Sequence, residues 1–282
     1  MTRWDSWIGR EETRKDRIDA GLVARWLATL DRAPAEDGAV PQGFHWCLCT
    51  PDAPTAMLGP DGHPRRDDSS ATFLPPLLQP RRMWASSEVE FLAPLRAGQS
   101  VTRTSRVDSI TEKRGGSGTL VFVDVAHETS GDGAPAVREV QTLVYRDAPP
   151  AGTAPVPPAP TGACFDLAGW DTVREVLPTE PLLLRYSALT FNSHRIHYDA
   201  PYARDQEGFR GLVVHGPLTA TLLLDLARRE FGDNALHSFT FRGLSPAICG
   251  EVLHLALRRA GEGWELGAFA GDGRAVMSAS AA

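Results

Sequence analysis

Residues 186–226 read YSALTFNSHRIHYDAPYARDQEGFRGLVVHGPLTATLLLDL, and this stretch organises our interpretation of the whole chain. It contains three histidines in a segment with many turn-forming residues: His194, His197 and His215. After Gly216 and Pro217, leucines recur at helical spacing. Proline suits the first turn of a helix, because the N–H that it lacks would have no partner there. The pattern therefore predicts a buried helix that begins at Gly216.

The predicted start of this helix has a chemical use. The first N–H groups of a helix have no partner within the helix, and the helix dipole adds partial positive charge beside them. The Gly216 N–H could therefore hold a carbonyl oxygen that becomes negative during a reaction. The alternative is an ordinary buried helix that follows a Gly-Pro turn.

Composition excludes several classes of protein. The 282 residues carry a formal net charge of -6, so they offer no basic surplus for nucleic acid. The four cysteines are scattered and lack the paired spacing of a zinc site, which predicts reduced thiols: Cys47, Cys49, Cys164 and Cys249. We find neither a secretory signal nor an apolar run near the roughly 20 residues of a membrane span. We therefore expect a cytoplasmic protein without membrane or nucleic-acid partners.

Alternating apolar and polar residues predict an antiparallel sheet in each half of the chain. The predicted strands cover residues 87–91, 101–110, 119–127, 137–145, 238–242, 251–259, 264–270 and 275–279. Helical spacing predicts an amphipathic helix over 16–30, and an edge segment is expected within 171–184. A further short strand is expected over 44–49.

A segment rich in Pro, Ala and Gly, residues 148–162, is expected to be a linker between halves 1–147 and 163–282. The Leu-x-Pro-x-x-x-Gly element at 92–98 returns at 244–250, each time after one strand and before the next. We therefore expect two copies of one α+β fold. The N-terminal copy would be degenerate, with its central helix shortened or replaced by the Pro-rich loop around 72–80.

Histidine near the predicted helix start suggests proton transfer. A neutral imidazole can accept a proton near pH 7 and return it, so His197 is a candidate general base or acid. An extended segment would place Asn192 and His197 on opposite sides, whereas a turn would bring them together. Another histidine, His63, lies in the turn signal 61–64, and we expect it to be a loop residue rather than a ligand.

The histidine segment resembles the hydratase motif of the MaoC-like (R)-specific enoyl-CoA hydratases, Asp-x-Asn-Pro-hydrophobic-His-x-Asp-Pro followed by a later His-Gly. The sequence LTFNSHRIHYDAPYA at 189–203, together with PRRMWA at 80–85, resembles the sequences of the type 2 hydroxyacyl-thioester dehydratases in particular. The resemblance covers most of the chain and implies a double hot-dog fold. It places the family's catalytic His on His197 and its oxyanion Gly on Gly216. The chain departs from the motif at Asn192, where the family has Asp, at His194 and at Arg195.

The resemblance implies a reaction as well as a fold. It implies reversible addition of water to an α,β-unsaturated acyl-CoA, with no metal or redox cofactor. The branch includes mesaconyl-C4-CoA and itaconyl-CoA hydratases, so a short dicarboxylyl-CoA is the expected substrate. The alternatives are a 3-hydroxyacyl-ACP dehydratase of fatty-acid synthesis and a non-catalytic protein that binds acyl thioesters. A double hot-dog could act as a monomer or as a homodimer.

Asn192 leaves one role open, because an amide cannot exchange a proton as a carboxyl group can. It could hold water or orient the imidazole, or it could only stabilise its loop. The family's carboxylate could then be replaced by Asp199, or His194 could share the work. Further binding candidates are Tyr198, His215, and the two arginines that could pair with acyl carboxylate or CoA phosphate, Arg195 and Arg204. A structural role is favoured for His215.

Overall fold

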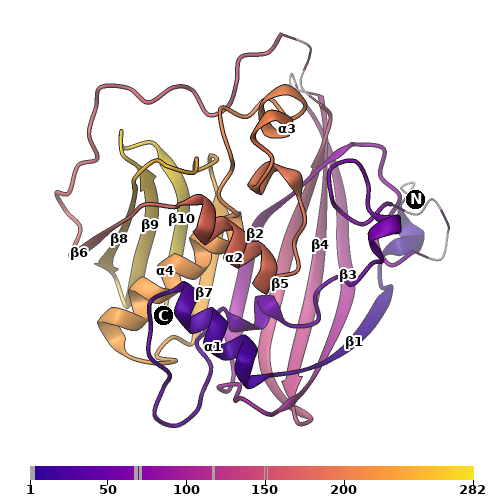
Figure 1. Cartoon of the computed structure of the whole chain (residues 1–282). Helices are drawn as coiled ribbons and strands as arrows, with labels where there is room; N and C mark the ends of the chain where they lie inside the picture. Colours follow the sequence, from indigo (N-terminus) through magenta and orange to yellow (C-terminus); the bar gives the residue numbers. More distant parts are fainter. Residues whose placement is uncertain (1–3, 67–68, 70–71, 116–117, 149, 151) are drawn as a thin grey trace.

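A computed structural model describes residues 4–66, 69, 72–115, 118–148, 150 and 152–282. These residues form one large antiparallel sheet, with helices gathered on one of its faces (Figure 1). The strands are β1 Glu11–Arg17, β2 Arg81–Phe91, β3 Ser100–Gly115, β4 Gly118–Gly131, β5 Ala134–Arg146, β6 Thr172–Val176, β7 Ser238–Gly243, β8 Leu253–Ala260, β9 Gly263–Ala270 and β10 Ala275–Ala281. The helices are α1 Ala20–Thr29, α2 Glu180–Leu189, α3 Ala200–Asp205 and α4 Gly216–Phe231. Short 3-10 turns are η1 Asp5–Trp7, η2 Phe44–Cys47, η3 Thr55–Met57 and η4 Arg195–His197.

The order of the strands repeats about the centre of the sheet. It runs β1-β3-β4-β5-β2 and then β7-β10-β9-β8-β6, so each strand of the first half has a counterpart in the second. The halves meet where β2 pairs antiparallel with β7, and Glu88 lies opposite Thr240. These two residues also correspond when Leu92 is aligned with Leu244 in the repeated loop element. The two antiparallel sheets expected from the sequence are therefore halves of one continuous sheet, related by a pseudo-twofold axis at this pair.

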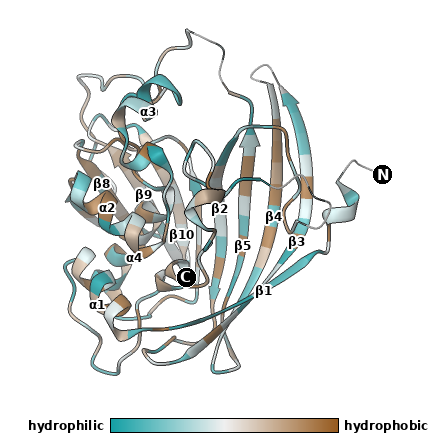
Figure 2. Cartoon of the chain, turned by 45° about the vertical axis from the view of Figure 1, so that its right-hand side comes forward, coloured by the Kyte–Doolittle hydropathy of each residue, from teal (hydrophilic) through white to brown (hydrophobic). Residues whose placement is uncertain are grey.

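Helix α4 forms the core of the C-terminal half. It begins at Gly216, as predicted, with Pro217 in its first turn. Leu218 and Leu223 are fully buried, and burying a leucine side chain contributes about 1.5–3 kcal/mol relative to exposure. Figure 2 shows hydrophobic and hydrophilic residues alternating along the long strands, which is the pattern of a sheet with one buried face. This packing fixes the N-terminus of α4 in space.

The N-terminal half repeats the beginning of the C-terminal half but not its long helix. The pair β1 and α1 corresponds to β6 and α2, as their places in the sheet order show. Between α1 and β2, the described residues contain only the short turns η2 and η3. The degenerate central helix expected from the sequence is therefore replaced by loops in the described part of this segment.

The strand predicted over 44–49 is wrong, because residues 44–47 form the 3-10 turn η2. Gly43 has a φ of 91°, a left-handed conformation that turns the chain just before this segment. All six residues from 44 to 49 are buried, so the segment has no alternating exposed face. Phe44 packs edge-on against Trp26 of α1, with ring centroids 5.5 Å apart. The apolar run therefore fills the core below α1 instead of joining the sheet.

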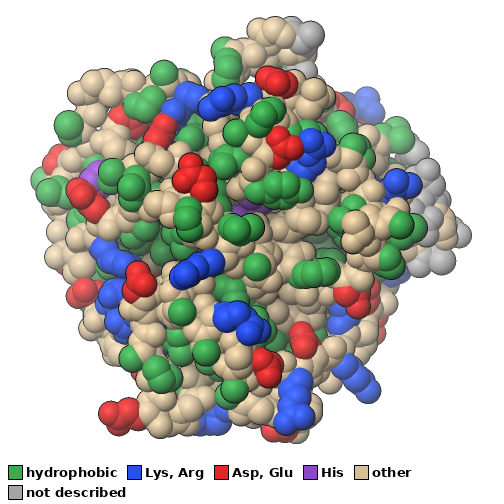
Figure 3. Space-filling model, in the orientation of Figure 1, with side chains coloured by type: hydrophobic (Ala, Val, Ile, Leu, Met, Phe, Trp, Pro, Cys, Tyr) green, Lys and Arg blue, Asp and Glu red, His purple; other side chains and the backbone are tan. Residues whose placement is uncertain are grey.

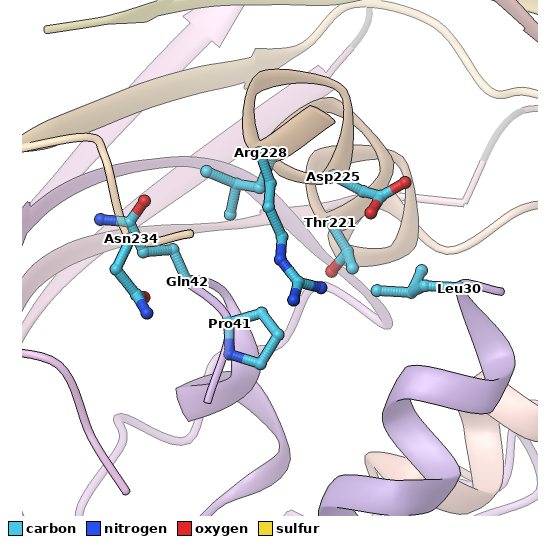
Figure 4. Close-up of a pocket in the computed structure, with 8 residues that line it drawn as sticks. Leu30, Pro41, Gln42, Thr221, Asp225, Arg228 and Asn234 are labelled. Carbon is cyan, nitrogen blue, oxygen red and sulfur yellow. The ribbon is translucent and has the colours of Figure 1, made fainter. Parts of the chain in front are cut away.

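A buried ion cluster holds the far end of α4. Asp225 of α4 lies 3.0 Å from Arg174, 2.7 Å from Arg229 and 3.5 Å from Arg32. Beside it lies a cavity of about 10 Å³, drawn in Figure 4 with Arg228 pointing toward Pro41. A space of this size holds about one water molecule, so it cannot accept an acyl thioester.

The linker predicted over 148–162 crosses from β5 to β6 on one side of the molecule (Figure 1). Its residues 149 and 151 lie outside the described part of the chain. Val156 donates a backbone hydrogen bond to Gly208 and accepts one from Arg210. These bonds fasten the linker to the loop that precedes α4. No helix within the described ranges is both long enough and apolar enough to span a membrane.

Candidate active site

The loop after α2 is shaped by Asn192. Its side-chain Oδ1 accepts a hydrogen bond from the His194 N–H at 3.0 Å, and its own N–H donates to the Ser187 carbonyl at 2.9 Å. The preceding Phe191 has a φ of 48°, so the chain reverses direction here. Asn192 thereby acts as a local turn former, and the 3-10 turn η4 that follows carries His197 inward.

The His197 side chain is buried and held in one orientation. Its Nδ1–H donates to the Val213 carbonyl at 2.7 Å, because a carbonyl can only accept. Its other nitrogen, Nε2, has no hydrogen-bond partner among the described residues. It is also not fully enclosed by protein atoms, unlike the buried polar atoms without a partner elsewhere in the described chain. Solvent can therefore reach Nε2, and this nitrogen is the one that can accept a proton.

The His197 ring lies at the start of α4. It stacks on the ring of His215 with centroids 3.5 Å apart and planes 20° apart, and His215 is the residue that precedes the helix. Ser187 Oγ and His215 Nε2 share a hydrogen bond of 2.8 Å, which orients His215. Among the described residues no acceptor takes the Gly216 N–H. The His197 imidazole thus packs on the residue that precedes a helix whose first N–H is unpaired, and such an N–H can hold a developing oxyanion.

A loop from the N-terminal half lies against this site. The backbone N–H of Arg195 donates to the Asp61 carbonyl at 2.9 Å, and Ser193 Oγ donates to the Gly62 carbonyl at 2.6 Å. Gly62 has a φ of 88°, and a Cβ there would lie 2.0 Å from the Ser193 carbonyl oxygen. Only glycine permits so close an approach.

This contact brings Asp61 and His63 to the histidine segment. His63 Nδ1 lies 3.1 Å from Asp61 Oδ2, and the His63 ring lies 4.1 Å from the His194 ring. His194 in turn lies edge-on to His197, with ring centroids 5.5 Å apart. One ligand atom from each of Asp61, His63 and His194 lies within 4.8 Å of the other two, and carboxylate and imidazole could also hold a divalent cation.

Burial sets the charge state of these groups. It lowers the pKa of His194 to about 2 and that of His197 to about 4, and neighbouring histidines contribute in the same direction. Burial would raise the pKa of Asp61, but hydrogen bonds and charge from His63 lower it to about 2. At neutral pH the site therefore contains neutral imidazoles beside an ionised carboxylate.

The other predicted site residues divide into two groups. Arg195 is engaged within its own loop, since it pairs with Asp199 at 2.7 Å and stacks on Tyr202. Asp199 also caps α3 by accepting a hydrogen bond from the Tyr202 N–H at 3.0 Å. Tyr198 and Arg204 are exposed, and Arg204 donates to a backbone carbonyl. Substrate binding by these residues stays a prediction.

The sequence prediction missed the N-terminal contribution to the site. His63 was expected to be a loop residue rather than a ligand, and it does lie in a loop, but its ring is in contact with His194. The available signal was the sequence Asp-Gly-His-Pro at 61–64, which predicts a tight turn and carries a carboxylate beside an imidazole. Figure 3 shows a histidine near the middle of the face that the helices occupy, among hydrophobic, acidic and basic side chains.

The lowered pKa of His197 predicts an unusual pH dependence. A base must be neutral to accept a proton, and burial keeps His197 neutral until the pH falls to about 4. We expect kcat/KM to stay level from pH 8 down to about pH 5 and then to decrease, because kcat/KM reports groups of the free enzyme. The measurement is kcat/KM from pH 4 to pH 9. A decrease centred near 6.5 would contradict this assignment.

The same shift has a consequence for stability. In the unfolded chain this imidazole binds a proton near pH 6.5, whereas in the folded chain it does so near pH 4. Acidification between these values therefore favours the unfolded chain. The contribution to stability is fully present above pH 6.5 and is lost as the pH falls toward 4.

Comparison with known sequences points to one family. The family described as hydroxyacyl-thioester dehydratase type 2 matches residues 43–249. A mesaconyl-C4-CoA hydratase from Chloroflexus aurantiacus is 40% identical to the chain over 280 residues, which cover 98% of this chain and 96% of the hydratase. The match includes both halves of the sheet and the whole histidine segment.

Solved structures give the fold. A MaoC-like dehydratase from Phytophthora capsici superimposes with a TM-score of 0.70 at 17% identity, covering 99% of this chain and 98% of that chain. A Mycobacterium tuberculosis protein with a double hotdog fold superimposes with a TM-score of 0.58 at 14% identity, covering 97% and 95%. The predicted α+β double hot-dog fold is therefore confirmed.

Proposed function

Because the chain belongs to the type 2 hydroxyacyl-thioester dehydratase family, we propose that it adds water reversibly to an α,β-unsaturated acyl-CoA. It is a hydro-lyase. The observation that carries this proposal is the position of His197, whose ring stacks on His215, the residue that precedes α4, and whose Nε2 is free to accept a proton. One group can move a proton, and the other can stabilise an oxyanion.

The proposed mechanism uses these two groups in turn. In hydration a water molecule loses a proton to His197 Nε2, and its oxygen bonds to the β-carbon of the acyl group. The electron pair of the double bond moves onto the thioester carbonyl, where the Gly216 N–H stabilises the enolate oxygen by about 3–4 kcal/mol. The enolate then takes the proton from His197 at its α-carbon. Dehydration is the reverse sequence.

The proposed substrate is a short dicarboxylyl-CoA, with mesaconyl-C4-CoA first and itaconyl-CoA second. The near full-length likeness to a mesaconyl-C4-CoA hydratase supports this choice. It favours CoA as the carrier over the acyl carrier protein of a fatty-acid dehydratase. The accessible His197 Nε2 favours catalysis over simple binding of an acyl thioester.

The division of the chain also belongs to the proposal. The N-terminal hot-dog is assigned to 1–147, the linker to 148–162, and the C-terminal hot-dog with the hydratase motif to 163–282. The repeated strand order supports these boundaries. We further propose a cytoplasmic enzyme that acts as a monomer or a homodimer, because one chain already contains both hot-dog copies.

The test is the absorbance of the enoyl-thioester band with purified protein. Crotonyl-CoA, mesaconyl-C4-CoA and itaconyl-CoA are supplied separately, and the products are separated to identify the hydroxyacyl form. Loss of the band on mesaconyl-C4-CoA, at a rate proportional to enzyme concentration, supports the proposal. Binding of all three thioesters without any loss of the band would contradict it.

A prediction for Asn192 follows from its hydrogen bonds. Asn192→Ala removes the oxygen that accepts from the His194 N–H. The folded state loses about 1 kcal/mol of stability, and the loop is no longer held in its conformation. We expect kcat to fall about 100-fold, because displacements near 1 Å have effects of that size. Asn192→Asp retains the oxygen and should keep at least half of kcat. Equal rates in all three forms, from the same band assay, would remove Asn192 from the site.

A further inference from the structure

The carboxylate that the family motif carries at position 192 must be replaced by another group if the proposed hydratase uses one. Asp199 is the nearest carboxylate by sequence, but it pairs with Arg195 at 2.7 Å and caps α3. The side-chain partners of Asp199 among the described residues are Arg195 and Tyr202, and neither is one of the site histidines.

Asp61 is better placed to serve. It belongs to the N-terminal half, and it reaches the histidine segment because Gly62 lies against Ser193. Its Oδ1 accepts from the His63 N–H and its Oδ2 from His63 Nδ1, and each carboxylate oxygen can accept a second hydrogen bond. One of its oxygens lies within 4.8 Å of a ring nitrogen of His194. Two hydrogen bonds of about 2.8 Å can span this separation through one water molecule.

His194 connects the group from the N-terminal half to the proposed base. Its ring contacts His63 on one side and lies edge-on to His197 on the other. Within the described residues, neither ring nitrogen of His194 forms a hydrogen bond. Neither nitrogen is fully enclosed by protein atoms. Both can therefore meet water. The His194 ring therefore lies between the group that contains Asp61 and the His197 ring, where a bound water could contact both.

We propose that Asp61, His63 and His194 form the site that holds the attacking water, so that Asp61 replaces the carboxylate missing at position 192. The proposal rests on the hydratase function proposed above. The water gives one hydrogen to His197 Nε2 and directs the other toward Asp61 and His194 as a hydrogen bond. A lone pair on its oxygen then faces the β-carbon.

The step is balanced without a further reactant. One O–H bond of water breaks, and its proton passes to His197. The C–O bond forms at the β-carbon, the double-bond pair moves to the thioester oxygen, and the same proton returns to the α-carbon. The second O–H bond of water remains in the 3-hydroxyacyl product. Asp61, His63 and His194 neither gain nor lose a proton.

The experiment compares Asp61→Asn, His63→Gln and His194→Gln in the full-length enzyme. We expect kcat to fall about 100-fold in Asp61→Asn and in His194→Gln, the size of effect that a misplaced reactant produces. The KM for the acyl-CoA should stay within about threefold, because the group contacts water rather than thioester. His63→Gln should lose less, because it leaves both water-binding partners in place. Melting temperature is measured for every variant.

His254→Gln is the matched control. His254 also lies beside a carboxylate, with its Nδ1 3.6 Å from Glu175, but it is on β8 and stacks on Phe165. Its kcat should equal that of the unaltered enzyme. Rates within fivefold of the unaltered enzyme in all three test variants would overturn the proposal. So would a joint change of kcat, KM and melting temperature, since that is the result of a structural role.

Two further outcomes are separable. Metal analysis of the purified enzyme should find no stoichiometric divalent cation, because the group binds water only. One cation per chain, lost in His194→Gln, would overturn the proposal and assign a metal site. Absence of turnover by the unaltered enzyme on every acyl-CoA would instead contradict the hydratase function.

Discussion

His197→Ala is expected to lower kcat/KM for the enoyl thioester by about 1,000-fold, within the range that a positioned general base contributes. The variant loses the only ring in the described site that is both fixed by a backbone carbonyl and accessible at its second nitrogen. The loss should be in kcat, because His197 exchanges a proton and does not anchor CoA. The enoyl-thioester band, followed at saturating substrate, measures it.

His197→Gln separates chemistry from packing. Glutamine can still donate a hydrogen bond to the Val213 carbonyl, but its amide cannot accept and return a proton. The melting temperature of His197→Gln should lie nearer to that of the unaltered enzyme than the melting temperature of His197→Ala does. The activity of His197→Gln should be as low as that of His197→Ala. His237→Ala, an exposed histidine, is the control and should be unaffected. Activity above one tenth in His197→Gln would exclude His197 as the base.

The sheet and the long helix could be predicted from sequence because their signals are local. Alternation every second residue marks β8 and β9, and leucines at helical spacing behind a Gly-Pro pair mark α4. The repeated loop element also indicated the two halves. What alternation cannot provide is the partner of β2, because pairing with β7 depends on residues far away in the chain. The sequence therefore predicted two sheets where the structure has one.

The site could be predicted only where the histidine motif is continuous. His197 stacks on His215, and Gly216 follows His215 directly, because a short turn and one helix start position all three. The contact between Gly62 and Ser193 joins residues 131 positions apart. No local sequence pattern shows which distant segment a loop packs against. The turn chemistry of 61–64 was recognisable, but its partner was not. For Asn192, the sequence left open whether its side chain binds water and the imidazole or only stabilises the loop. The hydrogen bond from the His194 N–H to its Oδ1 depends on the shape of the loop, which the sequence pattern does not give.

Gly62→Ala is expected to lower kcat about 100-fold, because the added Cβ would lie 2.0 Å from the Ser193 carbonyl oxygen and must move the loop. The Ser193 carbonyl belongs to the backbone, so no side chain can rotate away to make room. Because Asp61 and His63 flank Gly62, a displacement of this loop also moves both residues away from His194. The measurement is kcat by the band assay, with melting temperature measured in parallel.

Gly133→Ala distinguishes this displacement from ordinary backbone strain. Gly133 has a φ of 87°, close to the 88° of Gly62, but a Cβ there would meet nothing within 4 Å. Both variants should lose roughly 1–3 kcal/mol from placing alanine in a left-handed conformation, and Gly62→Ala should lose more because of its contact with the Ser193 carbonyl. Only Gly62→Ala should also lose activity, since only it separates the two halves of the site. If both variants keep full kcat, the contact between Gly62 and Ser193 stabilises the fold without contributing to catalysis, and the N-terminal half supplies no group to the reaction.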